Sequence, residues 1–202
     1  MKRVSISSRL LLHCCCGPCA TVSIDVFRQM GYEVVTLFFN PNIAPADEYN
    51  KRLSAWKTVC EDKGVHGIIR EDDEYKPQKD RDRCAHCYQT RLRIASKVAI
   101  DINANHFTTT LTISPYQNHA LIRAIGDSMR GFRYFDLRDR YRDSLIQSRS
   151  LNLYLQRYCG CLESQLEAQW MMKNRREKRR KTYGDCVPWK PDCVLDRDNN
   201  RY

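Results

Sequence analysis

Short apolar runs alternate with longer segments whose apolar residues recur at helical spacing. The apolar, β-branched and aromatic runs predict strands over residues 9–13, 33–39, 65–70, 107–111 and 132–135. The intervening segments predict helices over residues 21–30, 47–63, 84–100 and from a cap at Ser114 to about residue 129. A further helical region is expected from residue 148 onward, with an interruption at residues 158–161.

This alternation of strands and helices predicts a Rossmann-like (HUP-type) α/β fold, in which a mainly parallel sheet is flanked by helices and followed by a C-terminal helical segment. The length of 202 residues suits one domain with an appendage. We therefore expect one α/β domain over residues 1–173, including the C-terminal helices, and a basic tail over residues 174–202.

The chain has a formal net charge of +10, from 34 Lys and Arg residues against 24 Asp and Glu residues. Such a charge favours a polyanionic partner, of which nucleic acid is the commonest, over the alternative of a merely solvated basic surface. Much of the excess lies in the run from residue 174 to residue 181. No stretch approaches the roughly 20 apolar residues of a membrane span. We expect a cytoplasmic protein with no membrane partner, in which the 11 cysteines are reduced or bound to metal.

Cys14, Cys15, Cys16 and Cys19 crowd into six residues directly after the first predicted strand. Ligands bind beyond the carboxyl ends of the strands in an open parallel sheet, and the amino end of the following helix favours thiolates there. The chain contains neither a P-loop nor a dinucleotide-binding fingerprint. The pattern therefore indicates a metal, a cluster or a redox reaction at this position.

Two further cysteine motifs add to this chemistry. Cys84 and Cys87 form a C-x-x-C motif, which with two of the first cysteines provides four thiolates for an iron–sulfur cluster or a structural zinc. Cys159-Gly160-Cys161 suits either a strained, reducible disulfide that carries electrons or two unrelated buried thiols. A competing interpretation takes Cys16-Gly17-Pro18-Cys19 as the redox motif of a thioredoxin-like disulfide reductase, but it leaves Cys84 and Cys87 without a function.

Six ordered blocks of sequence resemble the cobalamin-independent epoxyqueuosine reductases of the QueH type. The blocks span residues 10 to about 165 and lie at residues 11–19, 39–45, 48–52, 84–92, 109–116 and 153–161. The matching residues include the cysteines of the three motifs, together with Pro18, Asn40-Pro41-Asn42, Arg52, Arg91 and Ser114-Pro115-Tyr116.

The resemblance implies that the chain reduces epoxyqueuosine in tRNA to queuosine, with tRNA and an electron donor of unknown identity as partners. It implies a 4Fe-4S cluster on Cys15, Cys16, Cys84 and Cys87, and a redox-active disulfide between Cys159 and Cys161. It also implies an additional iron, for which Cys19 is the candidate ligand. Cys14 departs from the pattern of the family, and the spacing to Pro18 selects Cys15 and Cys16 as ligands.

Removal of an epoxide oxygen takes two electrons and two protons and releases water. Our hypothesis is that an iron centre acts as a Lewis acid on this oxygen while the dithiol relays electrons. The candidates for proton supply are His13, Asp25 and Tyr88. The candidates for contacts with the modified base are Asn40, Asn42, Arg52 and Arg91, each of which suits a structural hydrogen bond equally well. Residues 138–140 and 175–181 are expected to hold the tRNA backbone by charge, and Cys186 and Cys193 have no assigned role.

Overall fold

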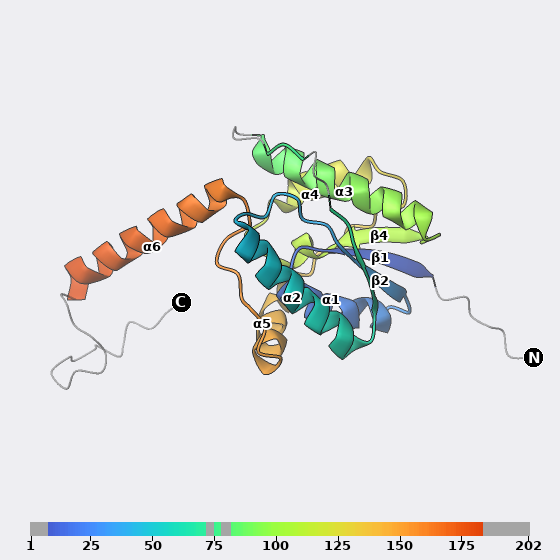
Figure 1. Ribbon diagram of the computed structural model, residues 1–202, viewed down its shortest axis with the longest axis horizontal. Coiled ribbons are helices and arrows are strands. Elements are labelled where there is room, and N and C mark those ends of the chain that lie inside the picture. Colours follow the sequence, from blue (N-terminus) through green and yellow to red (C-terminus); the bar gives the residue numbers. More distant parts are fainter. Residues whose placement is uncertain (1–7, 72–74, 78–81, 184–202) are drawn as a thin grey trace, which may run out of the picture.

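The sheet lies at the centre of the molecule (Figure 1). The computed structural model describes residues 8–71, 75–77 and 82–183. In this part of the chain four parallel strands are arranged in the order β3-β2-β1-β4. The strands are β1 (Arg9–Cys14), β2 (Glu33–Phe38), β3 (His66–Ile69) and β4 (His106–Thr109). The predicted parallel α/β fold is therefore confirmed.

Helices cover both faces of the sheet (Figure 1). One face carries α1 (Gly17–Gln29), α2 (Ala46–Lys63) and α5 (Tyr141–Ser150), and the other carries α3 (Arg83–Asp101) and α4 (His119–Asp127). The central strand β1 is enclosed from both sides, which explains why Leu10, Leu11 and Leu12 follow one another and are all fully buried. No helix in the described parts of the chain is long and apolar enough to cross a membrane.

The last described helix, α6 (Leu162–Tyr183), projects away from the body of the molecule (Figure 1). An ion pair between Arg83 and Glu167 ties its first half to the start of α3. Leu166 and Trp170 are exposed on it. The helix crosses the predicted domain boundary between residues 173 and 174 without a break, so the division into a domain and a tail stays a prediction.

Helix α1 begins at Gly17, four residues earlier than the sequence pattern predicts. The fixed backbone angle of Pro18 suits the first helical turn. A Cβ atom on Gly17 would lie 2.5 Å from the carbonyl oxygen of Ala55, so glycine is what lets this turn pack directly against α2. The early start places Cys19 inside the first turn of the helix.

The segment after β4 also differs from the prediction. A short 3₁₀ helix, η1 (Thr110–Ile113), follows the strand, and α4 is capped by the side chain of Asn118 rather than by Ser114. The strand predicted at residues 132–135 is absent from the described structure apart from a single bridge between Phe107 and Phe132. The aromatic side chain of Phe132 instead fills the core against Phe107, which is a use of aromatic residues that strand propensity does not distinguish.

The predicted C-terminal helical region is confirmed in part, because α6 follows the predicted interruption at residues 158–161. A 3₁₀ turn, η2 (Arg138–Arg140), leads directly into α5, which ends at Ser150. Residues 151–157, which we expected to be helical, are irregular, and together with the predicted interruption at 158–161 they form a segment that runs back to the edge of the sheet. This segment carries the Cys159-Gly160-Cys161 motif to the site described next.

Candidate active site

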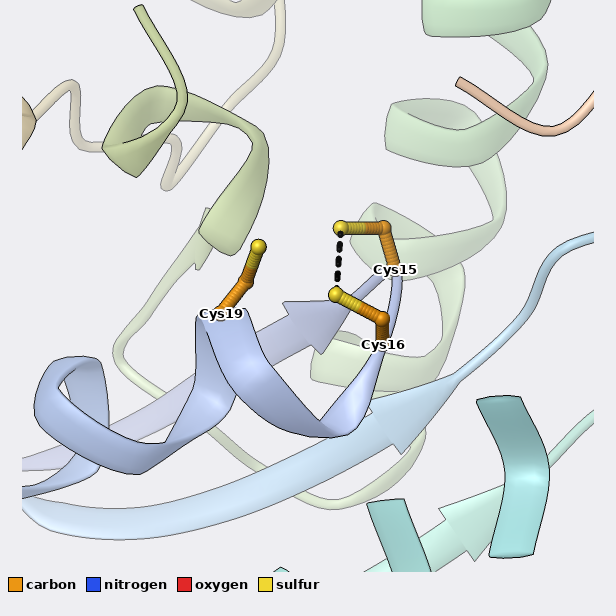
Figure 2. Close-up of side chains that lie close together, drawn as sticks. All are labelled: Cys15, Cys16 and Cys19. Atoms are coloured by element: carbon orange, nitrogen blue, oxygen red, sulfur yellow. Dashed lines mark hydrogen bonds between the residues drawn. The ribbon is translucent and has the colours of Figure 1, made fainter. Parts of the chain in front are cut away.

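Cys15, Cys16 and Cys19 form a compact group of thiols at the carboxyl end of β1 (Figure 2). Cys15 and Cys16 connect β1 to α1, and their sulfur atoms are 3.7 Å apart. The sulfur atoms of all three residues lie within 4.8 Å of one another. The side chains are buried, with exposed fractions of 8%, 0% and 5%. We call these three residues the inner thiol group.

Two polar side chains from distant parts of the chain donate hydrogen bonds to the inner thiol group. Thr110, which follows β4, donates its hydroxyl to the Cys15 sulfur at 3.5 Å. Gln156 donates its side-chain nitrogen Nε2 to the Cys16 sulfur at 2.9 Å, while its Oε1 atom is buried without a partner. Donors aimed at sulfur stabilise thiolates, which is the form that binds metal.

The three thiols of the inner group differ in acidity. Contacts with the sulfur atoms of Cys16 and Cys19 lower the pKa of Cys15 well below its ordinary value, and Thr110 and Arg91 act in the same direction. Burial raises the pKa of Cys16, and hydrogen bonds with the neighbouring thiols raise that of Cys19. These contacts favour the deprotonated form at Cys15 and disfavour it at Cys16 and Cys19.

Cys84 and Cys87 lie in the first turn of α3, where Cys84 is exposed and Cys87 is half-buried. Burial raises the pKa of Cys87 to about 11, while the charge of Arg91, one turn later in the helix, acts in the opposite direction. The metal-compatible cluster found among the described residues comprises Cys15, Cys16 and Cys19 and does not include Cys84 or Cys87.

Arg91 connects the separate thiols electrostatically. Its side chain is buried, donates a hydrogen bond to Asn42, and leaves its Nε atom without a partner. The charges of Cys87, Cys159 and Cys15, in decreasing order, favour the protonated guanidinium and oppose the effect of burial on its pKa. A single buried cation thus interacts with thiols from the connection between β1 and α1, from α3 and from the segment before α6.

The Cys159-Gly160-Cys161 motif, which we call the CGC loop, is held by backbone contacts. Arg52 donates one guanidinium nitrogen to the Cys159 carbonyl at 2.8 Å and another to the Tyr158 carbonyl at 2.9 Å. The backbone N–H of Ala44 donates to the Gly160 carbonyl at 2.9 Å. Gly160 has a φ of 141°, a conformation that side chains rarely allow. Both cysteines are free thiols in the structure.

A buried ion pair supports the residue that holds this loop. Glu48 accepts a hydrogen bond from Nε of Arg52 at 2.7 Å, and the two side chains are almost completely buried on adjacent turns of α2. The Tyr154 hydroxyl donates to the second carboxylate oxygen of Glu48 at 2.5 Å. Because Glu48 fixes the guanidinium, the remaining nitrogens of Arg52 are directed at the CGC loop.

The three candidates for proton supply have different environments. His13 is fully buried, both of its ring nitrogens are hydrogen-bonded, and burial lowers its pKa to about 4, so it is a neutral structural residue. Asp25 is paired with Lys63 at 2.7 Å. Of the three, only the Tyr88 hydroxyl is linked to a cysteine of the predicted redox pair in the described structure, because it donates at 2.8 Å to Gln117, whose Nε2 atom is 3.6 Å from the Cys159 sulfur.

The four candidates for base contacts are all buried: Asn40, Asn42, Arg52 and Arg91. Asn40 donates to the Cys14 carbonyl at 2.9 Å, and Asn42 accepts from Arg91. These residues make structural hydrogen bonds in the folded chain, and their contact with the modified base stays a prediction. Cys14 is also fully buried and lies outside the inner thiol group, whereas Cys186 and Cys193 lie outside the described residues.

Sequence reasoning missed three residues that contact sulfur atoms of the cysteine motifs. Thr110 and Gln156 lie within blocks that resemble a known family, yet no sequence pattern indicated which sulfur each would contact. Gln117 lies one residue beyond such a block. The sequence shows these three only as polar residues. That feature does not distinguish a side chain that contacts sulfur from one that is exposed to solvent.

The fold and the thiol groups define a class of protein, namely a Rossmann-like α/β protein that gathers cysteines at the carboxyl edge of its sheet for metal or redox chemistry. The fold is similar to that of the U34-tRNA thiolase NcsA from Methanococcus maripaludis, solved with its [4Fe-4S] cluster. The TM-score is 0.52 at 13% identity, and the match covers 87% of this chain and 67% of that chain. At this identity the similarity concerns the fold alone.

The sequence comparisons are more specific. The epoxyqueuosine reductase QueH family matches residues 10–167. A relative from Dehalococcoides mccartyi, named epoxyqueuosine reductase QueH, is 32% identical over 177 residues, which cover 80% of this chain and 95% of the relative. A Thermotoga maritima relative of the same name is 30% identical over 178 residues, covering 78% and 91%. The chain belongs to the epoxyqueuosine reductase QueH family, as the sequence motifs predict.

Proposed function

We propose that this protein is an oxidoreductase that reduces the epoxide of epoxyqueuosine in tRNA, and that it thereby produces queuosine. The family match over residues 10–167 is the observation that carries this proposal. The chemistry of the site agrees with it, because thiols from three parts of the chain interact with one buried cation, Arg91. We further propose that the enzyme works in the cytoplasm, where thiols are kept reduced.

We assign Cys15, Cys16, Cys84 and Cys87 as ligands of a 4Fe-4S cluster and Cys19 as a ligand of an additional iron. The sulfur donors suit iron, and the low pKa of Cys15 favours the deprotonated form that a ligand must have. The ligands of a four-iron cluster bind different irons, so Cys84 and Cys87 need not join the inner thiol group as closely as ligands of one ion would. When bound, the cluster supplies electrons singly, and the additional iron supplies a Lewis acid for the epoxide oxygen.

Cys159 and Cys161 supply the two-electron partner in this proposal. Closing their disulfide breaks two S–H bonds, forms one S–S bond, and releases two electrons and two protons. The epoxide consumes both: its two C–O bonds break, a carbon–carbon double bond forms, and the oxygen leaves as water. An external donor then returns two electrons and two protons to the disulfide. Arg52 and Ala44 hold the backbone of the loop by hydrogen bonds while the disulfide between its two sulfur atoms forms and breaks.

We propose that α6 holds the tRNA substrate. The helix starts directly after Cys161, so a substrate lying along it is close to the CGC loop. Residues 173–181 contain seven Lys and Arg residues and one Glu, a balance that attracts phosphates. Trp170 is 64% exposed on the same helix and offers a ring on which an unpaired base can stack.

The activity is tested with anaerobically purified protein and tRNA that contains epoxyqueuosine. We expect a broad absorption band at about 400 nm, as for iron–sulfur clusters, and conversion to queuosine measured by nucleoside mass spectrometry. Cys159→Ser should keep its iron but fail to turn over repeatedly. Cys60→Ser, a buried control outside the thiol groups, should keep its iron and turn over at the normal rate. A colourless zinc protein, or one that reduces disulfides without iron, would contradict the proposal.

The tRNA contact is tested by removing residues 174–202 and measuring binding at several salt concentrations. We expect weaker binding and a shallower dependence on salt, because fewer counterions are released when cations are lost. Trp170→Ala should weaken binding without changing the salt dependence, since it removes stacking and no charge. Unchanged binding by the truncated protein would exclude this role for the basic segment.

A further inference from the structure

Gln117 lies between Tyr88 and Cys159, in the turn that precedes α4. Its side-chain nitrogen Nε2 is 3.6 Å from the Cys159 sulfur. Its side-chain oxygen Oε1 accepts a hydrogen bond of 2.8 Å from the Tyr88 hydroxyl. The amide thus joins a buried tyrosine to one sulfur of the CGC loop.

The hydrogen bonds at Tyr88 determine which end of the Gln117 amide faces the sulfur. The backbone N–H of Asn118 points at the Tyr88 hydroxyl oxygen at 3.4 Å, and a backbone N–H can only donate. The Tyr88 oxygen therefore accepts this bond, and its single proton is available for another acceptor. Among the atoms of the Gln117 amide only Oε1 can accept that proton, so the NH₂ group faces Cys159.

An N–H donor directed at sulfur stabilises the thiolate more than the thiol, because the charged form is the stronger acceptor. Cys159 receives such a donor. Among the described residues, no N–H donor is directed at the sulfur of Cys161, and its hydrogen bonds are made by its backbone carbonyl. The two sulfurs of the CGC loop therefore have different surroundings although only one residue separates them.

We propose that Gln117 is a positioning residue that gives the two sulfurs unequal roles: Cys159 is the sulfur that exchanges electrons with the site, and Cys161 is its disulfide partner. The inference rests on the proposed redox function of the pair. In the oxidation step two S–H bonds break and one S–S bond forms between Cys159 and Cys161. The pair loses two electrons and two protons, which the epoxide consumes.

Limited alkylation tests this asymmetry without tRNA. The reduced, iron-loaded protein is treated anaerobically at neutral pH with a limiting amount of iodoacetamide and then digested with trypsin. Fragment spectra of the peptide covering residues 158–173 separate a label on Cys159 from one on Cys161. We expect the first label on Cys159, and about tenfold slower labelling of Cys159 in Gln117→Leu with Cys161 unchanged, as the loss of one hydrogen bond to a charged group predicts.

Three more variants make the result specific. Gln117→Glu should slow labelling at Cys159 further, because a carboxylate beside the sulfur disfavours the thiolate. Tyr88→Phe should have a smaller effect, since the amide remains but its orientation is no longer fixed. Gln89→Leu, which replaces an exposed glutamine on α3, should match the wild type. Iron content and circular dichroism verify that each variant is folded.

Two outcomes would overturn the inference: a first label on Cys161 in the wild type, or the same ratio of labels in Gln117→Leu and the wild type. The label ratio does not depend on the substrate. A wild-type protein that fails to convert epoxyqueuosine would therefore refute the proposed function, while the inequality of the two sulfurs would be decided by the labelling alone.

Discussion

The inner thiol group and the CGC loop present thiols at the same edge of the sheet, but the chain holds them in different ways. Cys15, Cys16 and Cys19 belong to a strand end and the first helical turn, both packed in the core. Cys159 and Cys161 are half-buried on an irregular segment that is held by contacts with its backbone. Rigid, buried thiols suit a resident metal, whereas a redox pair must change its own bonding and meet an external donor.

The largest expected effect comes from a serine in the inner thiol group. Cys15→Ser replaces the thiol with the lowest pKa of the three by a hydroxyl that stays protonated at neutral pH and binds iron poorly. We expect loss of the iron content, of the visible absorption band and of activity. Cys60→Ser, equally conservative and buried in the core, should retain all three. Normal iron content in Cys15→Ser would contradict the assignment of the inner thiol group to metal binding, and with it the contrast with the CGC loop.

A smaller but still large effect is expected when the loop loses its support. Arg52→Met leaves Glu48 buried without its cation and releases the Cys159 carbonyl, and breaking a buried pair costs about 3–5 kcal/mol. We expect this loss in the free energy of unfolding, measured by denaturant titration, together with reduced turnover and normal iron content in the folded protein.

Arg28 offers a matched control for this prediction. It also donates to two backbone carbonyls, those of Lys63 and Gly64, but it is exposed and far along α1 from the site. Arg28→Met should cost about 1 kcal/mol and leave turnover intact. If Arg52→Met turned over as fast as Arg28→Met, the contacts between Arg52 and the backbone of the CGC loop would have no functional importance.

The smallest effect concerns the backbone of the loop. Gly160→Ala places a Cβ atom 3.0 Å from Ile43 and 3.4 Å from Arg52, at a φ of 141°. We expect a loss of about 1–3 kcal/mol in stability and a measurable drop in turnover, as strain shifts the adjacent sulfurs. Gly64→Ala also has a positive φ but no atoms within 4 Å of the added carbon, so it should cost stability alone. Equal turnover in the two variants would show that backbone strain at Gly160 does not affect the adjacent sulfurs.

The sequence predicted those parts of the fold and the site that depend on local patterns. Apolar runs and helical periodicity located β1, β2, α2 and α3 within a few residues, because burial on both faces of a parallel sheet imposes those patterns. The pattern failed at residues 132–135 and 151–157, where aromatic side chains fill the core or the chain is irregular. There, packing against distant elements overrides local preference.

The cysteine motifs and the family they indicate were likewise determined by the sequence alone, since they depend on residue types at fixed short spacing. Only the tertiary structure decided which side chains form hydrogen bonds with the cysteines of these motifs. Thr110 reaches Cys15 across 95 positions, Arg52 reaches Cys159 across 107, and Gln156 reaches Cys16 across 140. No local pattern encodes such contacts, because they arise when the carboxyl ends of β1 and β4, the helix α2 and the segment before α6 meet at one edge of the sheet.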